Sequence, residues 1–307
     1  MIRFHNRVSN SVENEKVYGS QYVDLAYKNA LGHFLTEKIL TKPWLSKLMG
    51  VYEDSSASIS RIEPFIEQYG IRMDDYENQK FRSFNEFFIR KFRTGKRPFN
   101  ASPNVFCAGA EARYRAFENI SAHSRIQVKG IELSIEELFG NSELASEFDG
   151  GTVIIARLCP VDYHRFHFPI DGEVIRQYRV RGLLHSVNPV ALSVNPDIFL
   201  VNERQVCIFN NHSLGNMAMI EVGALGVGKI IQSYSHQSTF VGTKFEKGQE
   251  KGYFLFGGST VIWVLKKGTI TLAQDLASNS LNGEGGLETW IPLGDTLGEL
   301  RSGVSRK

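Results

Sequence analysis

Cysteine, long apolar runs and an excess of charge of one sign are all scarce in this chain of 307 residues. The three cysteines, Cys107, Cys159 and Cys207, lie far apart and form no CxxC pair. This excludes a disulfide framework and a zinc knuckle and is typical of a reducing compartment. The formal net charge of +2 gives no reason to expect nucleic acid as a partner.

No apolar run approaches the roughly 18 residues that a membrane-spanning helix needs. The longest, VIWVL, has the length of a strand. The N-terminus shows no apolar h-region, so the sequence gives no sign of a secretory signal. A hydrophobic content of 42% and a charged content of 22% are ordinary for a globular protein. Any contact with a membrane is therefore expected to be made from its surface.

Residues 1–100 predict a helical segment, because apolar residues recur at helical spacing in residues 22–40, 44–52 and 60–70. Gly70 is expected to end one helix, and Ser83 and Glu86 have capping-box spacing at the start of another. The stretch 83–92 mixes aromatic and basic residues. It could lie on an anionic bilayer, or it could face a core with its cations in solvent, and spacing alone favours the core.

Beyond the connector 94–104, short β-rich runs are divided by Gly, Asn or Asp. They occupy residues 150–158, 172–180, 205–211, 217–225, 228–235 and 252–265. One helix, with Ser134 as its cap and Glu137 as the partner, is expected to interrupt them. The predicted fold class is α+β, with a helical segment at 1–100 followed by a mostly antiparallel β-sheet catalytic domain at 101–307.

The stretch FLFGGSTVIWVL, residues 254–265, places Gly-Gly-Ser-Thr inside what otherwise predicts one buried strand. A β-bulge or a tight hairpin would explain the glycines. The pattern is not that of a hydrolase elbow, because no G-x-S-x-G is present and a strand follows. The bond between Gly258 and Ser259 offers other chemistry. Gly258 leaves its carbonyl open to attack, and the Ser259 hydroxyl is adjacent.

A second unusual stretch, LCPVDYHRFHFPIDG at residues 158–172, concentrates Asp162, His164, Arg165 and His167. In an extended chain the two imidazoles point to opposite faces, whereas a turn would let them converge. A zinc site is poorly supported, since no third ligand stands at a suitable spacing. Taken alone, the two residues are best explained as structural histidines.

Together, these two stretches resemble the phosphatidylserine decarboxylase proenzymes, a pyruvoyl-dependent family. Further blocks are similar and occur in family order, from about residue 83 to about residue 275. They are SFNEFFIRKF, GKRPF, GLLHSVNP, IEVGALGVGKI and FEKGQEKGYFLFGGST. The resemblance implies a carboxy-lyase that converts phosphatidylserine to phosphatidylethanolamine.

The resemblance also implies roles for individual residues. Ser259 would attack the Gly258 carbonyl, cut the chain into a β chain (1–258) and an α chain (259–307), and become the pyruvoyl group. His167 would activate the serine during cleavage, and His164 would serve decarboxylation, in proton transfer. No metal or pyridoxal phosphate is expected.

The sequence departs from the family where a triad carboxylate is expected. In CAGAEARYRAF, Glu111 stands in place of the family's Asp. Its additional methylene moves the charge by about 1.5 Å, and a misplacement of about 1 Å can cost on the order of 10²-fold in rate. Because each molecule cleaves only once, a slower reaction is tolerable. Glu111 is therefore the expected carboxylate, with a degraded site as the alternative.

The implied partners are a phosphatidylserine-containing membrane and the two cleaved chains as a heterodimer, with a dimer of heterodimers left open. The implied location is the cytoplasmic side of the cell membrane, held peripherally. Two alternatives remain at this point. One is a pyruvoyl decarboxylase for another amine-bearing acid, and the other is an uncleaved homologue that only binds lipid.

Overall fold

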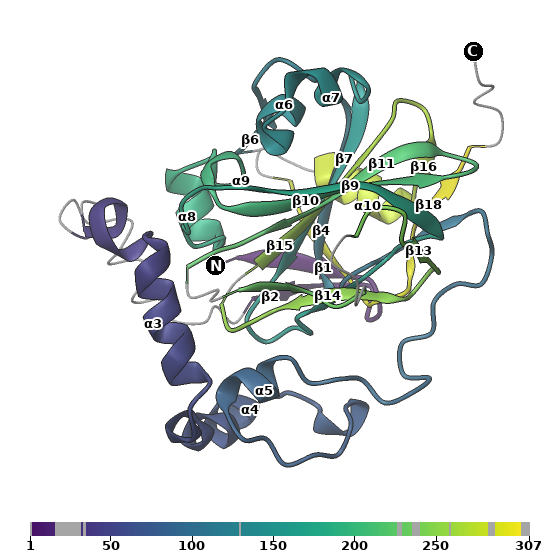
Figure 1. Ribbon diagram of the computed structural model, residues 1–307. Helices are drawn as coiled ribbons and strands as arrows, with labels where there is room; N and C mark the ends of the chain where they lie inside the picture. The colour runs from purple at the N-terminus through teal and green to yellow at the C-terminus, as the bar shows by residue number, and fades with distance from the viewer. Residues whose placement is uncertain are drawn as a thin grey trace.

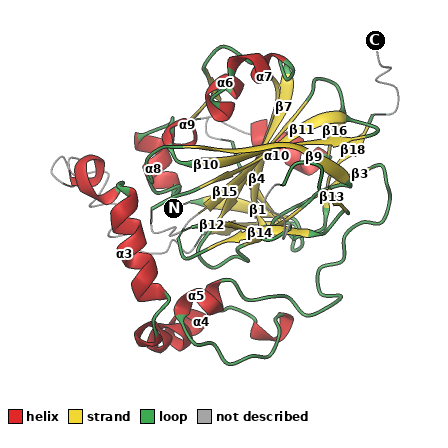
Figure 2. Ribbon diagram, in the orientation of Figure 1, coloured by secondary structure: helices red, strands yellow, loops and turns green. Residues whose placement is uncertain are grey.

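The computed structural model describes residues 2–15, 32, 35–128, 130–225, 229–234, 240–257, 259–281 and 286–301. Much of the helix expected over residues 22–40 lies outside the described residues, and so does Gly258. The described chain forms a β-rich body with a group of helices beside it, as Figure 1 and Figure 2 show.

The helical segment consists of short helices joined by tight turns. Its elements are η1 (Thr36–Leu40), α3 (Pro43–Glu53), η2 (Ser56–Arg61), α4 (Ile62–Tyr69), η3 (Met73–Asp75) and α5 (Phe84–Phe88). Two predicted helix ends are confirmed. Gly70 closes α4 at a φ of 65°, which glycine adopts without steric cost. Ser83 caps α5 by accepting the backbone N–H of Glu86 at 3.2 Å.

A ten-stranded sheet forms the body of the molecule, in the order β13-β9-β10-β11-β15-β7-β4-β17-β1-β2. All of its pairings are antiparallel except that between β1 and β17, which confirms the predicted fold class. Its strands are β1 (Arg3–Asn6), β2 (Ser11–Asn14), β4 (Ala112–Ile120), β7 (Gly151–Leu158), β9 (Gly172–Val180), β10 (Arg204–Asn211), β11 (Gly215–Val222), β13 (Lys244–Phe245), β15 (Ser259–Leu265) and β17 (Glu288–Ile291).

Smaller sheets complete the β structure. One joins β12 (Ile230–Gln232), β14 (Glu250–Phe254) and β8 (Arg165–His167), and another joins β16 (Ile270–Leu272), β18 (Thr296–Leu300) and β3 (Val105–Cys107). The strands β5 (Ile126–Val128) and β6 (Ile131–Leu133) pair with each other. Two strands, β14 and β15, therefore replace the single buried strand suggested by residues 252–265, and they belong to different sheets. The Gly-Gly-Ser junction is the point where the chain changes sheets.

Two features differ from the sequence pattern. The strands β1 and β2 lie within residues 1–100 and join the main sheet, because they pair with β17 near the other end of the chain. Beyond the expected α6 (Ile135–Phe139), four further helices interrupt the β region. These are α7 (Ser142–Ser146), α8 (Pro189–Val194), α9 (Ile198–Val201) and α10 (Gln274–Leu281). With four to eight residues each, they are too short to show a helical period.

The helical segment shares a core with the chain that leads to Ser259. Phe84, Phe87 and Phe88 of α5 pack with Ile62 and Phe65 around Phe256. The rings of Phe84 and Phe256 lie 5.3 Å apart at 81°, an edge-to-face arrangement. The helices are thus fixed to the body through the segment that joins β14 to β15.

Candidate active site at the junction of two sheets

Strand register brings three of the predicted site segments to one edge of the main sheet. Ser259, the first residue of β15, pairs with Leu158, the last residue of β7. The loop that carries Asp162 and His164 starts directly after Leu158, and Glu111 directly precedes β4, which is also antiparallel to β7. Antiparallel neighbours alternate in direction, so the start of β15, the end of β7 and the start of β4 meet.

Ser259 is fully buried, and its hydroxyl makes no hydrogen bond with any described residue. A buried hydroxyl without a partner costs about 1–3 kcal/mol. Such an atom is uncommon in a folded protein and is often connected with function. The hydroxyl is thus desolvated at the position where the sequence predicts a nucleophile.

His164 is the imidazole that the structure places next to this junction. It is fully buried, its Nδ1 lies 3.0 Å from the carbonyl oxygen of Asp162, and its Nε2 has no hydrogen-bond partner among the described residues. Burial lowers the pKa of His164 to about 3, although backbone groups of Asp162 and Gly257 oppose the shift. Since a carbonyl can only accept, Nδ1 carries the proton and Nε2 presents a lone pair. His164 is therefore a neutral base beside the residue that precedes Gly258.

His167 lies on β8 and has different neighbours. Its Nδ1 donates to the carbonyl oxygen of Gly248 at 2.8 Å, and its Nε2 lies 3.4 Å from the hydroxyl of Tyr163. Burial lowers its pKa as well. His164 lies beside the Gly257 backbone, whereas His167 contacts Gly248 and Tyr163. No hydrogen bond among the described residues joins either imidazole to Ser259, so the roles of both histidines stay predictions.

Glu111 is buried and forms an ion pair with Arg97. The Nε of Arg97 donates to one carboxylate oxygen at 2.6 Å, and its Nη2 donates to the other at 3.3 Å. Burial raises the pKa of Glu111, and Arg97 opposes this shift. Within the described part of the chain, no hydrogen bond connects Glu111 with either histidine. The expected carboxylate lies at the correct edge of the sheet but is not joined to an imidazole.

The helix α5 covers the junction from the helical side. The backbone N–H of Phe256 donates to Oδ1 of Asn85 at 2.7 Å. The Phe88 ring lies 3.9 Å from the His164 ring and 5.2 Å from the Phe256 ring, between centroids. The sequence analysis missed these residues. Their only signal was the aromatic stretch 83–92, which was interpreted as an amphipathic helix.

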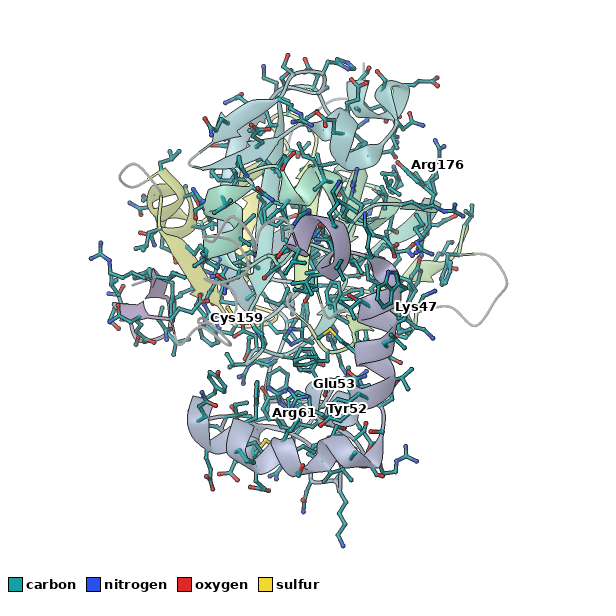
Figure 3. The ribbon with its side chains drawn as sticks, turned by 90° about the vertical axis from the view of Figure 1, so that its left-hand side faces the viewer. Lys47, Tyr52, Glu53, Arg61, Cys159 and Arg176 are labelled. Carbon is teal, nitrogen blue, oxygen red and sulfur yellow. The ribbon has the colours of Figure 1, made fainter. Side chains whose placement is uncertain are left out.

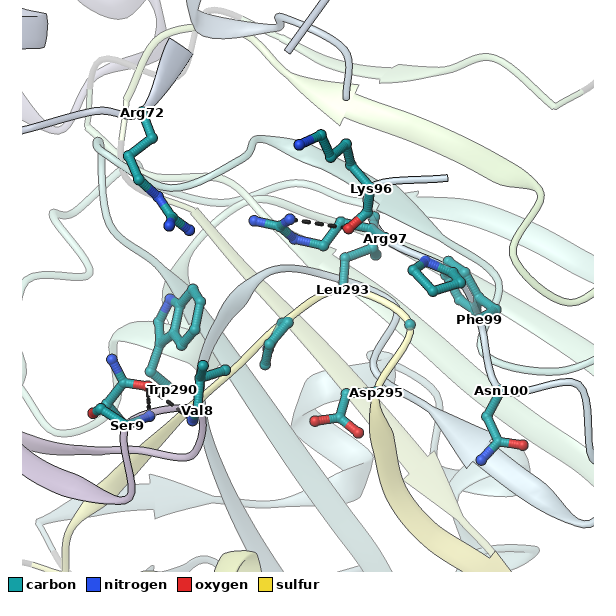
Figure 4. A pocket seen from close by; sticks show the side chains of 14 residues that line it. Val8, Ser9, Arg72, Lys96, Arg97, Phe99, Asn100, Trp290, Leu293 and Asp295 are labelled. Atoms are coloured by element: carbon teal, nitrogen blue, oxygen red, sulfur yellow. Dashed lines mark hydrogen bonds between the residues drawn. The ribbon is translucent and has the colours of Figure 1, made fainter. Parts of the chain in front are cut away.

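A separate cavity lies between the helical segment and the end of β17. It has a volume of about 580 Å³ and is bordered by Arg72, Lys96, Arg97, Phe99 and Trp290, among others (Figure 4). Neither Ser259 nor either histidine lines it. The cavity borders the predicted site through Arg97, the partner of Glu111, and through Phe99, whose ring centroid lies 5.9 Å from that of His167. Ser259 itself is separate from this cavity.

The α+β body thus buries the Ser259 hydroxyl where the two sheets meet and holds the neutral His164 imidazole beside the Gly257 backbone. The phosphatidylserine decarboxylase family model matches residues 84–284. A phosphatidylserine decarboxylase proenzyme of Clostridium botulinum (strain 657, type Ba4) is 40% identical over 303 residues, which cover 98% of this chain and 100% of that protein. Proteins of the same name from Clostridium perfringens and Clostridium novyi are each 38% identical over 300 residues, covering 97% of this chain and 99% of each relative.

The class is thus that of carboxy-lyases made as proenzymes. The chain belongs to the phosphatidylserine decarboxylase family.

We predict that acidification destabilises the folded proenzyme through His164. Its folded pKa of about 3 lies below the ordinary value of 6.5, so the unfolded chain binds the additional proton at intermediate pH. The stability that this residue confers is complete above about pH 6.5 and falls as the pH drops toward 3. At pH 4 the expected loss is on the order of 3 kcal/mol.

Denaturant unfolding of the Ser259→Ala chain between pH 8 and 4 measures this loss. Adding His164→Gln should flatten the pH dependence, whereas His123→Gln, which removes an exposed imidazole, should leave it unchanged. If the free energy of unfolding changed with pH equally in both variants, His164 would not be held neutral in the folded protein.

Proposed function

We propose that this chain cleaves itself between Gly258 and Ser259 and then decarboxylates phosphatidylserine to phosphatidylethanolamine. The observation that carries the proposal is that two buried atoms near the junction of the two sheets, Oγ of Ser259 and Nε2 of His164, have no hydrogen-bond partner among the described residues. Membership of the family gives the substrate class.

In the proposed cleavage, Oγ of Ser259 attacks the carbonyl carbon of Gly258 while a neutral imidazole accepts the hydroxyl proton. The C–N bond then breaks, the amine of Ser259 takes up a proton, and an ester joins the two residues. Loss of the Cα proton of Ser259 expels the Gly258 carboxylate and leaves dehydroalanine. Water hydrolyses the tautomeric imine, ammonia leaves, and a pyruvoyl group remains at residue 259.

Ser259 suits such a group, since its side chain is buried and no hydrogen bond holds it. A pyruvoyl ketone supplies the electron sink that decarboxylation of an amino acid requires. The surrounding side chains exclude water, because Phe88, Phe256 and the strand β15 are buried. His164 can exchange a proton at Nε2. No metal or pyridoxal phosphate enters the proposal.

Strand pairing indicates that the two product chains stay together. After cleavage the α chain would begin with β15, which pairs with β11 on one side and β7 on the other. A central strand with both edges paired is held by two full ladders of hydrogen bonds. We therefore propose a heterodimer of β chain (1–258) and α chain (259–307), which can itself dimerise.

The roles of the two histidines are proposed in two versions. The family resemblance gives cleavage to His167 and proton transfer in decarboxylation to His164. One observation favours His164 for cleavage as well, namely its position beside the Gly257 backbone, whereas His167 contacts Gly248 and Tyr163. In both versions Glu111 supplies the carboxylate. This requires Glu111 either to leave its ion pair with Arg97 or to act on an imidazole through the hydroxyl of Tyr163.

We predict that the wild-type protein separates into two chains on a denaturing gel and elutes as one species under native conditions. Intact mass should show one product that ends at Gly258 and another that starts with pyruvoyl. Ser259→Ala should remain a single full-length chain because the nucleophile is absent. Thr260→Ala, which removes the neighbouring hydroxyl, is the matched control and should still be processed. An intact wild type would refute the proposal.

Variants of the two histidines decide between the two versions, and a Glu111 variant tests the carboxylate that both versions share. If His167 is the cleavage base, His167→Ala should stay uncleaved, and His164→Ala should be cleaved but inactive. If His164 serves both steps, His164→Ala should stay uncleaved and His167→Ala should be cleaved. Glu111→Gln should slow processing by about 10²-fold. Unchanged processing in Glu111→Gln would remove that residue from the mechanism.

A lipid substrate would also explain the surface of α3. On this helix, small or polar side chains are buried and large apolar side chains are exposed. The small or polar residues Ser46, Gly50 and Glu53 face inward, and large apolar side chains face outward. Eight of the fourteen exposed large apolar side chains in the described chain lie between residues 35 and 59. They are Leu35, Ile39, Trp44, Leu48, Met49, Val51, Tyr52 and Ile59. Figure 3 faces this side, with Lys47 and Tyr52 labelled.

We propose that this apolar surface lies on a phosphatidylserine-containing bilayer, peripherally and on the cytoplasmic side. An apolar helix face with Lys38, Lys42 and Lys47 close by suits the boundary between anionic headgroups and acyl chains. No helix among the described residues is long and apolar enough to cross a membrane. The proposed membrane contact concerns α3, whereas the stretch 83–92 faces the core as predicted, because Phe84, Phe87 and Phe88 are fully buried.

We predict that the double variant Leu48→Ser, Val51→Ser floats about 10-fold or more less efficiently with phosphatidylserine vesicles, because each buried apolar side chain contributes roughly 1.5–3 kcal/mol. Ile175→Ser, which changes an exposed apolar residue on β9, is the control. Self-cleavage should be unaffected in both. Equal flotation of the double variant and the wild type would assign the surface to another partner.

The remaining alternatives differ in substrate. A decarboxylase for a soluble amine-bearing acid would release carbon dioxide from free serine or a related amino acid without vesicles, and an uncleaved lipid-binding homologue would release none. The assay on vesicles against free serine distinguishes all three.

A further inference from the structure

We propose that two buried arginines, Arg113 and Arg90, are positioning residues for His164 and act on it through Asp162. Arg113 belongs to the main sheet and Arg90 follows α5, so the loop is held from both parts of the chain. The consequence for catalysis rests on the function proposed above, but the positioning itself does not.

Arg113 holds the side chain of Asp162. Its Nη1 donates to Oδ2 of Asp162 at 2.6 Å, and the same oxygen accepts the backbone N–H of Cys159 at 2.7 Å. The second contact closes the turn that follows β7. Both charged side chains are about nine-tenths buried or more, so this charge-assisted bond lies in a medium of low dielectric. The turn that delivers His164 is therefore fixed by one carboxylate oxygen.

Glu15 supports Arg113 from the far side. Its Oε2 lies 3.0 Å from Nε of Arg113 and 2.6 Å from Nη2 of Arg157. Burial acts to raise the pKa of Glu15, but the two arginines outweigh it and lower this pKa to about 2. Glu15 is thus charged at neutral pH and orients the guanidinium of Arg113 toward Asp162.

Arg90 holds the backbone of the same loop. It is 1% exposed, and its Nη2 donates to the carbonyl oxygens of Val161 at 3.0 Å and Asp162 at 3.3 Å. Its guanidinium also lies 4.4 Å from the centroid of the Tyr76 ring. The Asp162 carbonyl oxygen is the one that faces Nδ1 of His164. Arg90 and His164 therefore share one acceptor, which the arginine keeps in place.

This arrangement selects one state of the imidazole. A fixed carbonyl opposite Nδ1 requires the proton there, so that Nε2 keeps its lone pair toward the junction. Burial is the main reason why the ring stays neutral, and the positive charge of Arg90 also disfavours a second proton on it. The two arginines thus supply orientation and tautomer, and Arg90 adds to neutrality.

The first test measures the tautomer in the uncleaved Ser259→Ala chain, so that it does not depend on activity. The ¹⁵N shifts of His164 should show a protonated Nδ1 and an unprotonated Nε2 at neutral pH. Adding Arg113→Lys or Arg90→Lys keeps a positive charge but loses the planar geometry of the guanidinium. Each should give mixed tautomers and a raised pKa for His164. Arg125→Lys, at a surface ion pair with Glu137, should change nothing.

The second test measures processing in the chain with Ser259 intact. Arg113→Lys should slow self-cleavage by about 10–10²-fold and shift its pH profile, as expected for a misplaced base. If Arg113→Lys fails to fold, Glu15→Gln keeps the side-chain shape and should cause a smaller shift of the same kind. A wild-type tautomer and pH profile in folded variants, with only a lower melting temperature, would overturn the proposal. An uncleaved wild type with the predicted tautomer would instead refute the proposed function alone.

Discussion

The organisation of this protein depends on the point where one chain leaves a three-stranded sheet and enters a ten-stranded one. β14 ends at Phe254 and β15 begins at Ser259, so the change of sheet takes only four residues. Gly257, at a φ of 140°, has a backbone conformation that side chains rarely permit. The pairing of Ser259 with Leu158 then sets the serine at the start of the histidine loop. Without this junction, the serine would be an ordinary residue of a buried strand.

Burial determines the chemistry at the junction. It lowers the pKa of His164 and His167 and raises that of Glu111 and Asp162, so burial favours the neutral form of these four groups. Both imidazoles are therefore neutral at neutral pH, and each can accept a proton without first losing one. The carboxylates depend on arginine partners, Arg97 for Glu111 and Arg113 for Asp162, to remain charged.

The helical segment packs directly against the candidate site. Phe256 lies in the core of the helices, and α5 contacts both the junction and the His164 ring. A helix α3 that turns apolar residues outward belongs to the same segment. These contacts therefore connect the helices that carry the exposed apolar side chains with the junction at which Ser259 is buried.

Local patterns in the sequence were enough to predict the fold class and the family and to mark Ser259 as the candidate nucleophile, because strand runs and the GGST and DYHRFH stretches are contiguous signals. They also located three helix ends, at Gly70, Ser83 and Ser134, since each depends on its own neighbours. Long-range folding was needed to show that β1 and β2 join the sheet, that His164 lies beside the Gly257 backbone, and that Arg97 holds Glu111. Each of these depends on residues far apart in the chain, which only strand register and burial bring together.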